Sequence, residues 1–199
     1  MKRNVIGVSL IGVLLLSFVF LTVVKGRASD ERDDDRDNRI AQGFRISPVP
    51  LNLKGRDPEL VGLGSYLVNA VGVCADCHSC PTYAPGHNPY GPPFGPPGGG
   101  DGKINNKNYL AGGVMFNPPG VVSANLTPEG DKRLPEGHTF REFRTLIRTG
   151  RDADEGGRIL QVMPWPVYKN MSDHDLRAIY EFLHAIPPAE PGTCVAPGQ

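Results

Sequence analysis

Residues Cys74 to His78 form the part of the sequence best suited to chemistry. They read Cys-Ala-Asp-Cys-His, which is the C-x-x-C-H signature for covalent attachment of a c-type haem. Thiols three positions apart on one helical turn point the same way, so each can add to one of the two haem vinyl groups. The imidazole of the next residue is then presented to the iron. We therefore predict one covalent haem c, held by Cys74 and Cys77, with His78 as the proximal iron ligand.

An electron carrier also needs a sixth iron ligand, so that the coordination barely changes when the iron cycles between its two states. Met163 fits this role best, because its soft thioether favours ferrous iron and raises the potential. The flanking prolines of Met163-Pro164-Trp165-Pro166 prevent a regular helix and favour an ordered loop. The alternatives to Met163 are two other methionines and four histidines: Met115, Met171, His87, His138, His174 and His184.

The cysteines also permit other interpretations. Cys74, Cys77 and Cys80 followed by Pro81 resemble part of an iron–sulfur run, with Cys194 as a remote fourth ligand, but the local fourth cysteine is missing. Two further interpretations of the same residues are a zinc site formed by Cys and His and a thioredoxin-like redox pair. If the haem takes Cys74 and Cys77, the remaining pair, Cys80 and Cys194, is expected to form a disulfide in an oxidising compartment.

The N-terminus carries an export signal. Lys2 and Arg3 precede an uncharged run from Val5 to Val24, and Gly26-Arg27-Ala28 matches a signal-peptidase site. The run is also long enough to cross a bilayer. We expect residues 1–28 to be a signal peptide or an N-terminal membrane anchor, which places the protein in the periplasm, either free or anchored by residues 5–24.

Composition limits the remaining possibilities. The chain has 199 residues, enough for one ordinary domain, and its 25 Gly and 20 Pro predict long irregular loops, above all over residues 81–100. Residues 29–199 carry 17 basic and 21 acidic side chains, with no basic stripe. Nucleic acid is therefore not expected as a partner. The acidic segment 29–55 is expected to be a flexible linker.

Three amphipathic helices are predicted. The first begins at the Asp57 cap and runs straight into Cys74, with Gly62 and Gly64 allowing another helix to approach closely. The second begins with a capping box of Thr139 and Glu142 and stops at Gly150. Its arginines Arg141, Arg144 and Arg148 are expected to form a solvated face. The third runs from the Ser172 cap to Pro187-Pro188. With no alternating strand pattern, the fold class is predicted to be all-α.

Three stretches resemble class I c-type cytochromes of the single-haem bacterial group that includes cytochrome subunits of alcohol and sugar-acid dehydrogenases. These stretches are residues 64–70, residues 123–128, and residues 163–168 leading to 175–180. The likeness covers roughly residues 56–188. It implies a class I cytochrome c-like domain over residues 56–190, followed by a tail over 191–199. It also implies crossed first and last helices, with Gly64 and Tyr66 facing Tyr180 and Leu183.

The resemblance implies transfer of one electron at a time through an exposed haem edge, with no substrate chemistry, so the chain is not expected to be an enzyme. The expected function is a periplasmic or membrane-tethered monohaem cytochrome, working between a dehydrogenase or quinol oxidoreductase and a terminal acceptor. The alternative is a haem sensor or haem enzyme whose sixth coordination site opens to a ligand. The chain departs from the dehydrogenase subunits in its Pro/Gly stretch and in having one haem motif where they usually carry three.

Overall fold

A computed structural model describes residues 34–117, 119–129, 134–153 and 156–195. The chain divides into two units, residues 1–38 and residues 39–199, and the description below concerns the second unit. The expected export segment, residues 5–24, lies outside the described residues. Within the described ranges, no helix combines the length and the apolar character needed to cross a membrane.

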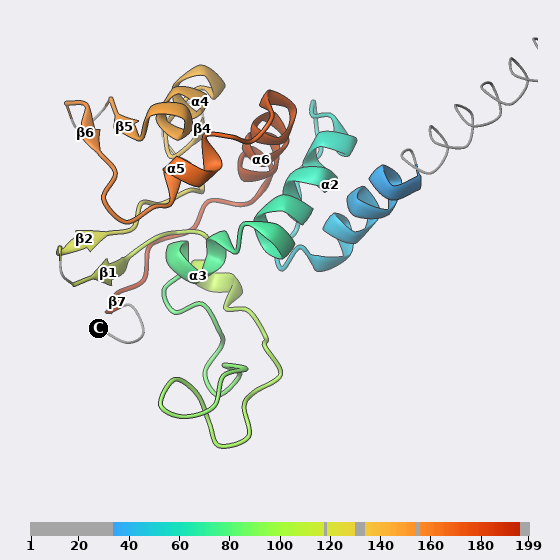
Figure 1. The fold of residues 1–199 in the computed structure, drawn as a ribbon. Helices are drawn as coiled ribbons and strands as arrows, with labels where there is room; N and C mark the ends of the chain where they lie inside the picture. The colour runs from blue at the N-terminus through green and yellow to red at the C-terminus, as the bar shows by residue number, and fades with distance from the viewer. Residues whose placement is uncertain (1–33, 118, 130–133, 154–155, 196–199) are drawn as a thin grey trace, which may run out of the picture. The chain divides into compact units, whose positions relative to one another are not determined.

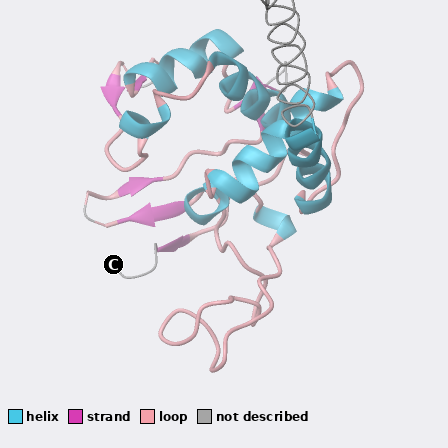
Figure 2. Cartoon of the chain, turned by 45° about the vertical axis from the view of Figure 1, so that its right-hand side comes forward, coloured by secondary structure: helices cyan, strands magenta, loops and turns pink. Residues whose placement is uncertain are grey.

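The described chain is rich in helices, which are joined by long loops and a few very short strands (Figures 1 and 2). The helices are α2 (Pro58–Tyr66), the π-helical η1 (Leu67–Val71), α3 (Cys74–His78), the 3₁₀ turn η2 (Asn106–Asn108), α4 (Phe140–Thr149), α5 (Trp165–Tyr168) and α6 (Asp173–Ala185). The strands are β1 (Val114–Phe116), β2 (Val121–Val122), β3 (Pro128–Glu129), β4 (Leu134–Pro135), β5 (Arg151–Asp152), β6 (Arg158–Ile159) and β7 (Cys194–Val195).

Helix α2 starts where the sequence predicts. The Asp57 side chain accepts a hydrogen bond from the Glu59 backbone, and Pro58 occupies the first helical position. The helix does not run straight into Cys74, so that expectation is wrong. It changes to the π-helix η1, and Val73 then adopts a left-handed conformation with φ of 44° before α3 begins. A β-branched residue is strained in this conformation. The left-handed residue interrupts the helical backbone, so α3 is a separate helix from η1.

Helices α2 and α6 pack against each other so closely that only glycine fits at position 64. A Cβ on Gly64 would lie 1.9 Å from the Ala178 carbonyl oxygen and 2.7 Å from the Phe182 Cβ. The predicted close approach at Gly64 is therefore confirmed. The predicted facing residues are corrected, because Gly64 meets Ala178 and Phe182, whereas Tyr180 packs against Phe140 and Phe143 of α4. These contacts put α2, α4 and α6 around one apolar core.

The structure differs from the flexible linker expected over residues 29–55, because residues 34–46 are helical. Gly62 of α2 lies under this helix, where a Cβ would approach the Ile40 and Phe44 side chains to 2.7 Å. The buried Ser65 hydroxyl donates to the Gly43 carbonyl at 2.7 Å. The second half of this helix is therefore part of the packed unit.

Helices α4 and α6 begin and end as predicted. Thr139 and Glu142 form a reciprocal capping box at the start of α4, and Gly150 ends it in a left-handed conformation. The Ser172 side chain caps α6. The arginines of α4 are not simply solvated, because Arg144 and Arg148 both bind the Asp173 carboxylate, at 2.8 and 2.7 Å. Both bonds join α4 to the first turn of α6.

The all-α prediction is met only in part, since the helices coexist with short strands. Strand β1 pairs antiparallel with β2 and parallel with β7, which brings the C-terminal segment beside residues 114–116. Two further pairs, β3 with β4 and β5 with β6, are hairpin-like ladders of two residues each. Strands of two or three residues are too short to show an alternating pattern in the sequence.

The Pro/Gly-rich stretch forms a long irregular loop that extends away from the helices in both Figure 1 and Figure 2. A bridge between Tyr83 and Ile104 closes its base. Backbone bonds such as Gly102 to the His87 carbonyl, at 2.9 Å, link its two sides. Residues 81–100 therefore form no helix or strand, as their composition predicted. The backbone hydrogen bonds within the loop hold its two sides together.

We expect Gly64→Ala to lower the free energy of unfolding by about 3 kcal/mol, because the added methyl group cannot fit without separating α2 from α6. Denaturant titration followed by circular dichroism would measure the loss. Gly91→Ala is the matched control, because nothing lies within 4 Å of a Cβ there. Equal stability of the two variants would contradict the proposed packing.

Candidate functional site

The three residues of the C-x-x-C-H motif lie on the single short helix α3. Both thiols are free: Cys77 is exposed and Cys74 is half-buried, packed against the main apolar core. Burial raises the pKa of Cys74 to about 11, and the neighbouring Cys77 adds to the effect. Burial also raises the pKa of Cys77. Both thiols therefore carry protons at neutral pH.

His78 is held in one orientation by a segment far away in the sequence. Its Nδ1 lies 2.9 Å from the Ala124 carbonyl oxygen, and the backbone of Gly112 donates to the His78 carbonyl at 2.7 Å. A carbonyl can only accept, so Nδ1 must carry the proton. Ring and backbone of His78 are thus both fixed by the segment that runs from Gly112 to Ala124.

The remaining ring nitrogen of His78, Nε2, has the properties of a metal ligand. Burial lowers the pKa of His78, although the bond to Ala124 works in the opposite direction. A lowered pKa favours the neutral ring, in which Nε2 keeps its lone pair. Among the described residues, the only hydrogen bond of the His78 ring is the one from Nδ1, so the Nε2 lone pair is not committed to a protein donor.

The loop that carries Met163 is attached to the same region. Met163 is half-buried and packs against the core cluster that Cys74 also joins. Helix α5 follows it, and the Tyr168 hydroxyl at the end of α5 donates to the Gly72 carbonyl at 3.0 Å. The Cys74 and Cys77 thiols both contribute to the raised pKa of Tyr168, after burial. The structure therefore brings the Met163 loop and the haem motif together through Tyr168 and Gly72.

The alternative sixth ligands have other surroundings. Met115 lies on β1 and is 39% exposed. Met171 packs against the main core just before the α6 cap. His87 is paired with Asp101 at 2.7 Å in the Pro/Gly loop. His174 and His184 belong to α6, where the His184 ring lies against Tyr180, and His138 is buried before α4.

The predicted pairing of the other two cysteines is confirmed. Cys80 and Cys194 form a disulfide with their Cα atoms 5.8 Å apart. Sulfur atoms in a disulfide are not thiolate ligands. Neither Cys80 nor Cys194 is then available for the iron–sulfur cluster that the spacing of the four cysteines had left open.

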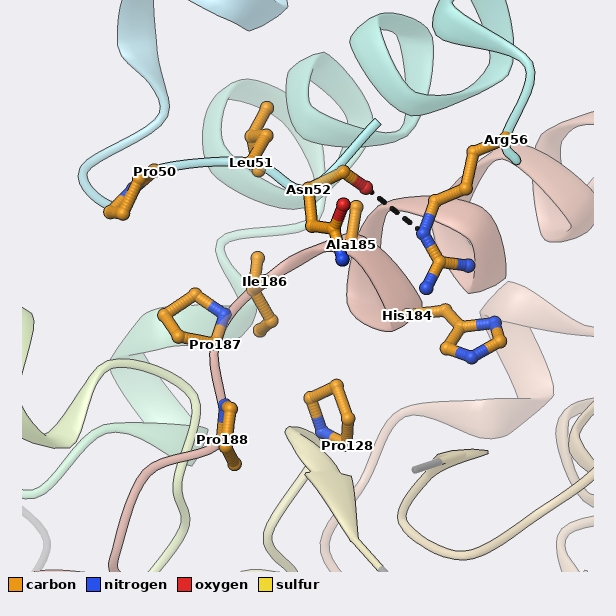
Figure 3. A pocket seen from close by; sticks show the side chains of 10 residues that line it. All are labelled: Pro50, Leu51, Asn52, Arg56, Pro128, His184, Ala185, Ile186, Pro187 and Pro188. Atoms are coloured by element: carbon orange, nitrogen blue, oxygen red, sulfur yellow. Dashed lines mark hydrogen bonds between the residues drawn. The ribbon is translucent and has the colours of Figure 1, made fainter. Parts of the chain in front are cut away.

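A cavity of about 500 Å³ lies elsewhere (Figure 3). Its walls come from residues 50–52, Arg56, Pro128 and residues 184–188 at the end of α6 and just after it. The Arg56 side chain donates to the Asn52 carbonyl at 3.0 Å. Arg56 and His184 lie on the same side of the cavity. None of Cys74, Cys77, His78 and Met163 lines this cavity, so it is not part of the motif's site.

The residues around α3 fit a covalent haem by their chemistry. Two free thiols and one imidazole whose Nε2 has no protein hydrogen bond lie on the same short helix. Val71 and Val73, just before the motif, and Val167, next to the Tyr168 that bonds Gly72, each have more than half of their surface exposed. Exposed apolar surface next to attachment groups suits a large apolar prosthetic group.

Sequence comparisons point the same way. No protein-family model matches the chain. Over 132 residues, 65% of the chain, it is 31% identical to the gluconate 2-dehydrogenase cytochrome c subunit of Pantoea cypripedii. Over 135 residues, 66% of the chain, it is 27% identical to the cytochrome c subunit of the quinone-type alcohol dehydrogenase of Gluconobacter oxydans (strain 621H).

The matches cover only 24% and 23% of those two relatives, so the chain corresponds to about a quarter of their length. Both relatives are cytochrome c subunits of dehydrogenases. The similarity is therefore to a cytochrome c subunit, over about two-thirds of this chain.

Two partners of the site were not found by sequence reasoning. The Ala124 carbonyl is a backbone group, and any residue would supply it. Its only signal was that Ala124 lies in one of the stretches that resemble cytochromes. Tyr168 lies in another such stretch, but nothing in its spacing predicted a bond to Gly72.

We expect iodoacetamide to modify Cys77 faster than Cys74 in the haem-free protein at pH 8, because Cys77 is exposed and the buried Cys74 has a pKa of about 11. The rate at Cys74 should keep rising with pH up to that value, because the thiolate is the reactive form. Peptide mapping without reductant would follow each site. Cys80 and Cys194 provide the internal control and should remain unmodified as one crosslinked peptide, and labelling of either would contradict the structure.

Proposed function

We propose that this chain is a monohaem c-type cytochrome that carries single electrons and does not turn over a substrate. Cys74 and Cys77 would hold the haem through thioether bonds, with His78 and Met163 as the axial ligands. The observation that carries the proposal is the state of His78. Its Nδ1 proton is committed to Ala124, which leaves the Nε2 lone pair free for a metal, and two free thiols lie on the same short helix. The similarity to cytochrome c subunits supports the same conclusion.

When bound, the haem supplies an iron that alternates between the ferric and the ferrous state. The chain's own residues would orient and protect it. The bond from Nδ1 to the Ala124 carbonyl fixes the plane of the His78 ring and makes Nε2 a stronger donor. The bond from Tyr168 to Gly72 holds the loop after Met163 against the start of α3. Two fixed segments favour a coordination that stays the same during electron transfer.

The partner and the location form the second part of the proposal. We infer that the protein exchanges electrons with a dehydrogenase or a quinol oxidoreductase and passes them to a terminal acceptor. The names of the two relatives favour a dehydrogenase as the electron source. From the uncharged run over residues 5–24 we infer that the protein is exported to the periplasm, where it is either released or anchored to the cytoplasmic membrane by that run.

We expect the exported protein, made with haem-attachment machinery, to exceed its polypeptide mass by one haem that acidified solvent does not extract. The loaded protein should be reduced by dehydrogenase-containing membranes of its host and reoxidised through a terminal oxidase. Stopped-flow absorbance would measure both steps. The variant Cys77→Ala should lose the double attachment.

Two results would contradict the proposed electron carrier. Haem that is fully extractable from the wild-type protein would reject covalent attachment. A loaded protein that ignores such membranes but consumes peroxide or binds NO like a dedicated enzyme or sensor would reject the carrier role.

We expect Met163→Ala to lose the weak far-red band that a sulfur ligand gives to ferric haem. It should also bind added cyanide or CO more readily and show a lower reduction potential, because the ferrous state loses its soft ligand. Absorption spectra and potentiometric titration would measure these changes. Met115→Ala is the matched control and should keep the wild-type spectrum. If Met115→Ala loses the band and Met163→Ala does not, the assignment is wrong.

A further inference from the structure

The Ala124 carbonyl can control His78 only if its own position is fixed. The residue before it is tied to the start of β1: the Ser123 backbone donates to Val114 at 2.9 Å and accepts from Gly113 at 3.0 Å. The Ser123 hydroxyl accepts a further bond from the Val114 backbone at 3.0 Å. The chain also passes very close here, because a Cβ on Gly112 would lie 2.5 Å from the Ala124 oxygen.

The residues after Ala124 are fixed by a polar cluster that reaches the C-terminal segment. Asn125 accepts two bonds from Thr127, one from its backbone at 2.9 Å and one from its hydroxyl at 2.7 Å. The Asn125 amide donates to the Ala189 carbonyl at 3.0 Å, and the Ala189 backbone donates to the Thr127 hydroxyl at 3.1 Å. Ala189 of the C-terminal segment is thus held at both of its backbone polar groups.

The C-terminal segment is itself anchored beside the haem motif. We name residues 187–195 the C-terminal strap. Its Glu190 carbonyl accepts a bond from Asn108 at 2.8 Å, and its last two residues form β7 against β1. Cys194 is bonded to Cys80, two positions after His78, and a Cβ on Gly192 would lie 1.7 Å from the Cys80 oxygen.

These contacts form a closed path. It runs from His78 to Cys80, along the strap to Ala189, through Asn125 and Thr127 to Ala124, and across the hydrogen bond back to His78. Thr127 is only 1% exposed, so no water can easily replace its hydroxyl.

We propose that Asn125 and Thr127 are positioning residues that use the strap to hold the Ala124 carbonyl on His78 Nδ1 and so set the reduction potential of the haem. The proposal rests on the function proposed above, in which His78 binds the iron. A hydrogen bond from the distal ring nitrogen makes the ligating nitrogen a stronger donor. A stronger donor stabilises ferric iron more than ferrous iron, so a loosened carbonyl raises the potential.

The test uses the haem-loaded protein and two variants that damage the cluster in different ways. Thr127→Val removes the hydroxyl at nearly constant volume, and Asn125→Asp removes the donor to Ala189 while keeping the acceptor for Thr127. Thr127→Ser keeps the hydroxyl and should restore wild-type behaviour. Thr145→Val, which loses a bond to Arg141 within α4, controls for the substitution, and Ile147→Val controls for a general loss of stability.

Two measurements report on His78 rather than on folding. Potentiometric titration of Thr127→Val should show the balance of ferric and ferrous protein, at a fixed ambient potential, shifted at least about threefold toward ferrous. Asn125→Asp adds a carboxylate whose charge itself favours ferric iron, so this variant is assessed by proton exchange. The NMR signal of the His78 Nδ1 proton should exchange with water at least about tenfold faster in both variants. The two controls and Thr127→Ser should show neither change.

The outcomes separate the two proposals. Loaded variants that keep the wild-type potential and exchange rate overturn the positioning role and leave the electron carrier intact. The same shift in Ile147→Val would also overturn it, because a general loss of stability would then explain the effect. A wild-type chain that attaches no haem rejects the proposed function and the positioning role together.

Discussion

The hydrogen bond between His78 and Ala124 is the interaction on which the site depends. It joins positions 46 residues apart at 2.9 Å, and it decides which ring nitrogen of His78 keeps a lone pair. Without it, the half-buried ring could rotate or carry its proton on Nε2. The surrounding loops keep the two partners in place, because Gly112 bonds to the His78 backbone and the start of β1 bonds to Ser123. The Ala124 carbonyl and the Gly112 backbone N–H therefore both link the loop segment to the motif helix.

The helices serve a different purpose, which is to form the core on which α3 and the Met163 loop rest. The close packing of α2 and α6 at Gly64 and the contact of Tyr180 with α4 assemble that core. Leu110, which is fully buried, belongs to it and also bonds to the hydroxyl of Ser79, the residue after His78, at 2.9 Å. The core and the site thus meet directly at the end of α3.

The sequence predicted the parts of this structure that depend on local chemistry. Capping residues such as Thr139 and Ser172 act through neighbours three positions away, so they marked the ends of α4 and α6 correctly. The Cys74–His78 motif likewise lies on one short helix, as its spacing predicted. The π-helical turn before Gly72, the left-handed Val73 and the helix over residues 34–46 were missed. They arise from tertiary packing, which overrides local preference.

The contacts that complete the site could not be predicted from the sequence, for a related reason. The Ala124 carbonyl, the Asn125 and Thr127 cluster and the strands β1 and β7 join segments that are tens of residues apart. Each of these contacts has a backbone group on at least one side, and a backbone group carries no residue signature. The pairing of Cys80 with Cys194 is the exception. It could be inferred because cysteine is rare and the motif left two of the four unused. Among these long-range contacts, only the one made by side chains of a distinctive type was visible in the sequence.

The C-terminal strap shows why such contacts are needed here. Its residues include three prolines and a glycine but few apolar side chains, so burial alone contributes little to holding it. The Cys80–Cys194 bond instead spans a separation of 114 residues. Closing a loop of that length removes about 4 to 5 kcal/mol of chain entropy from the unfolded state in the simplest model. With the strap secured at that end, the hydrogen bonds at Ala189 and Glu190 form without the full cost of ordering a free tail. A covalent bond close to the motif therefore makes a weak polar cluster sufficient to position the Ala124 carbonyl.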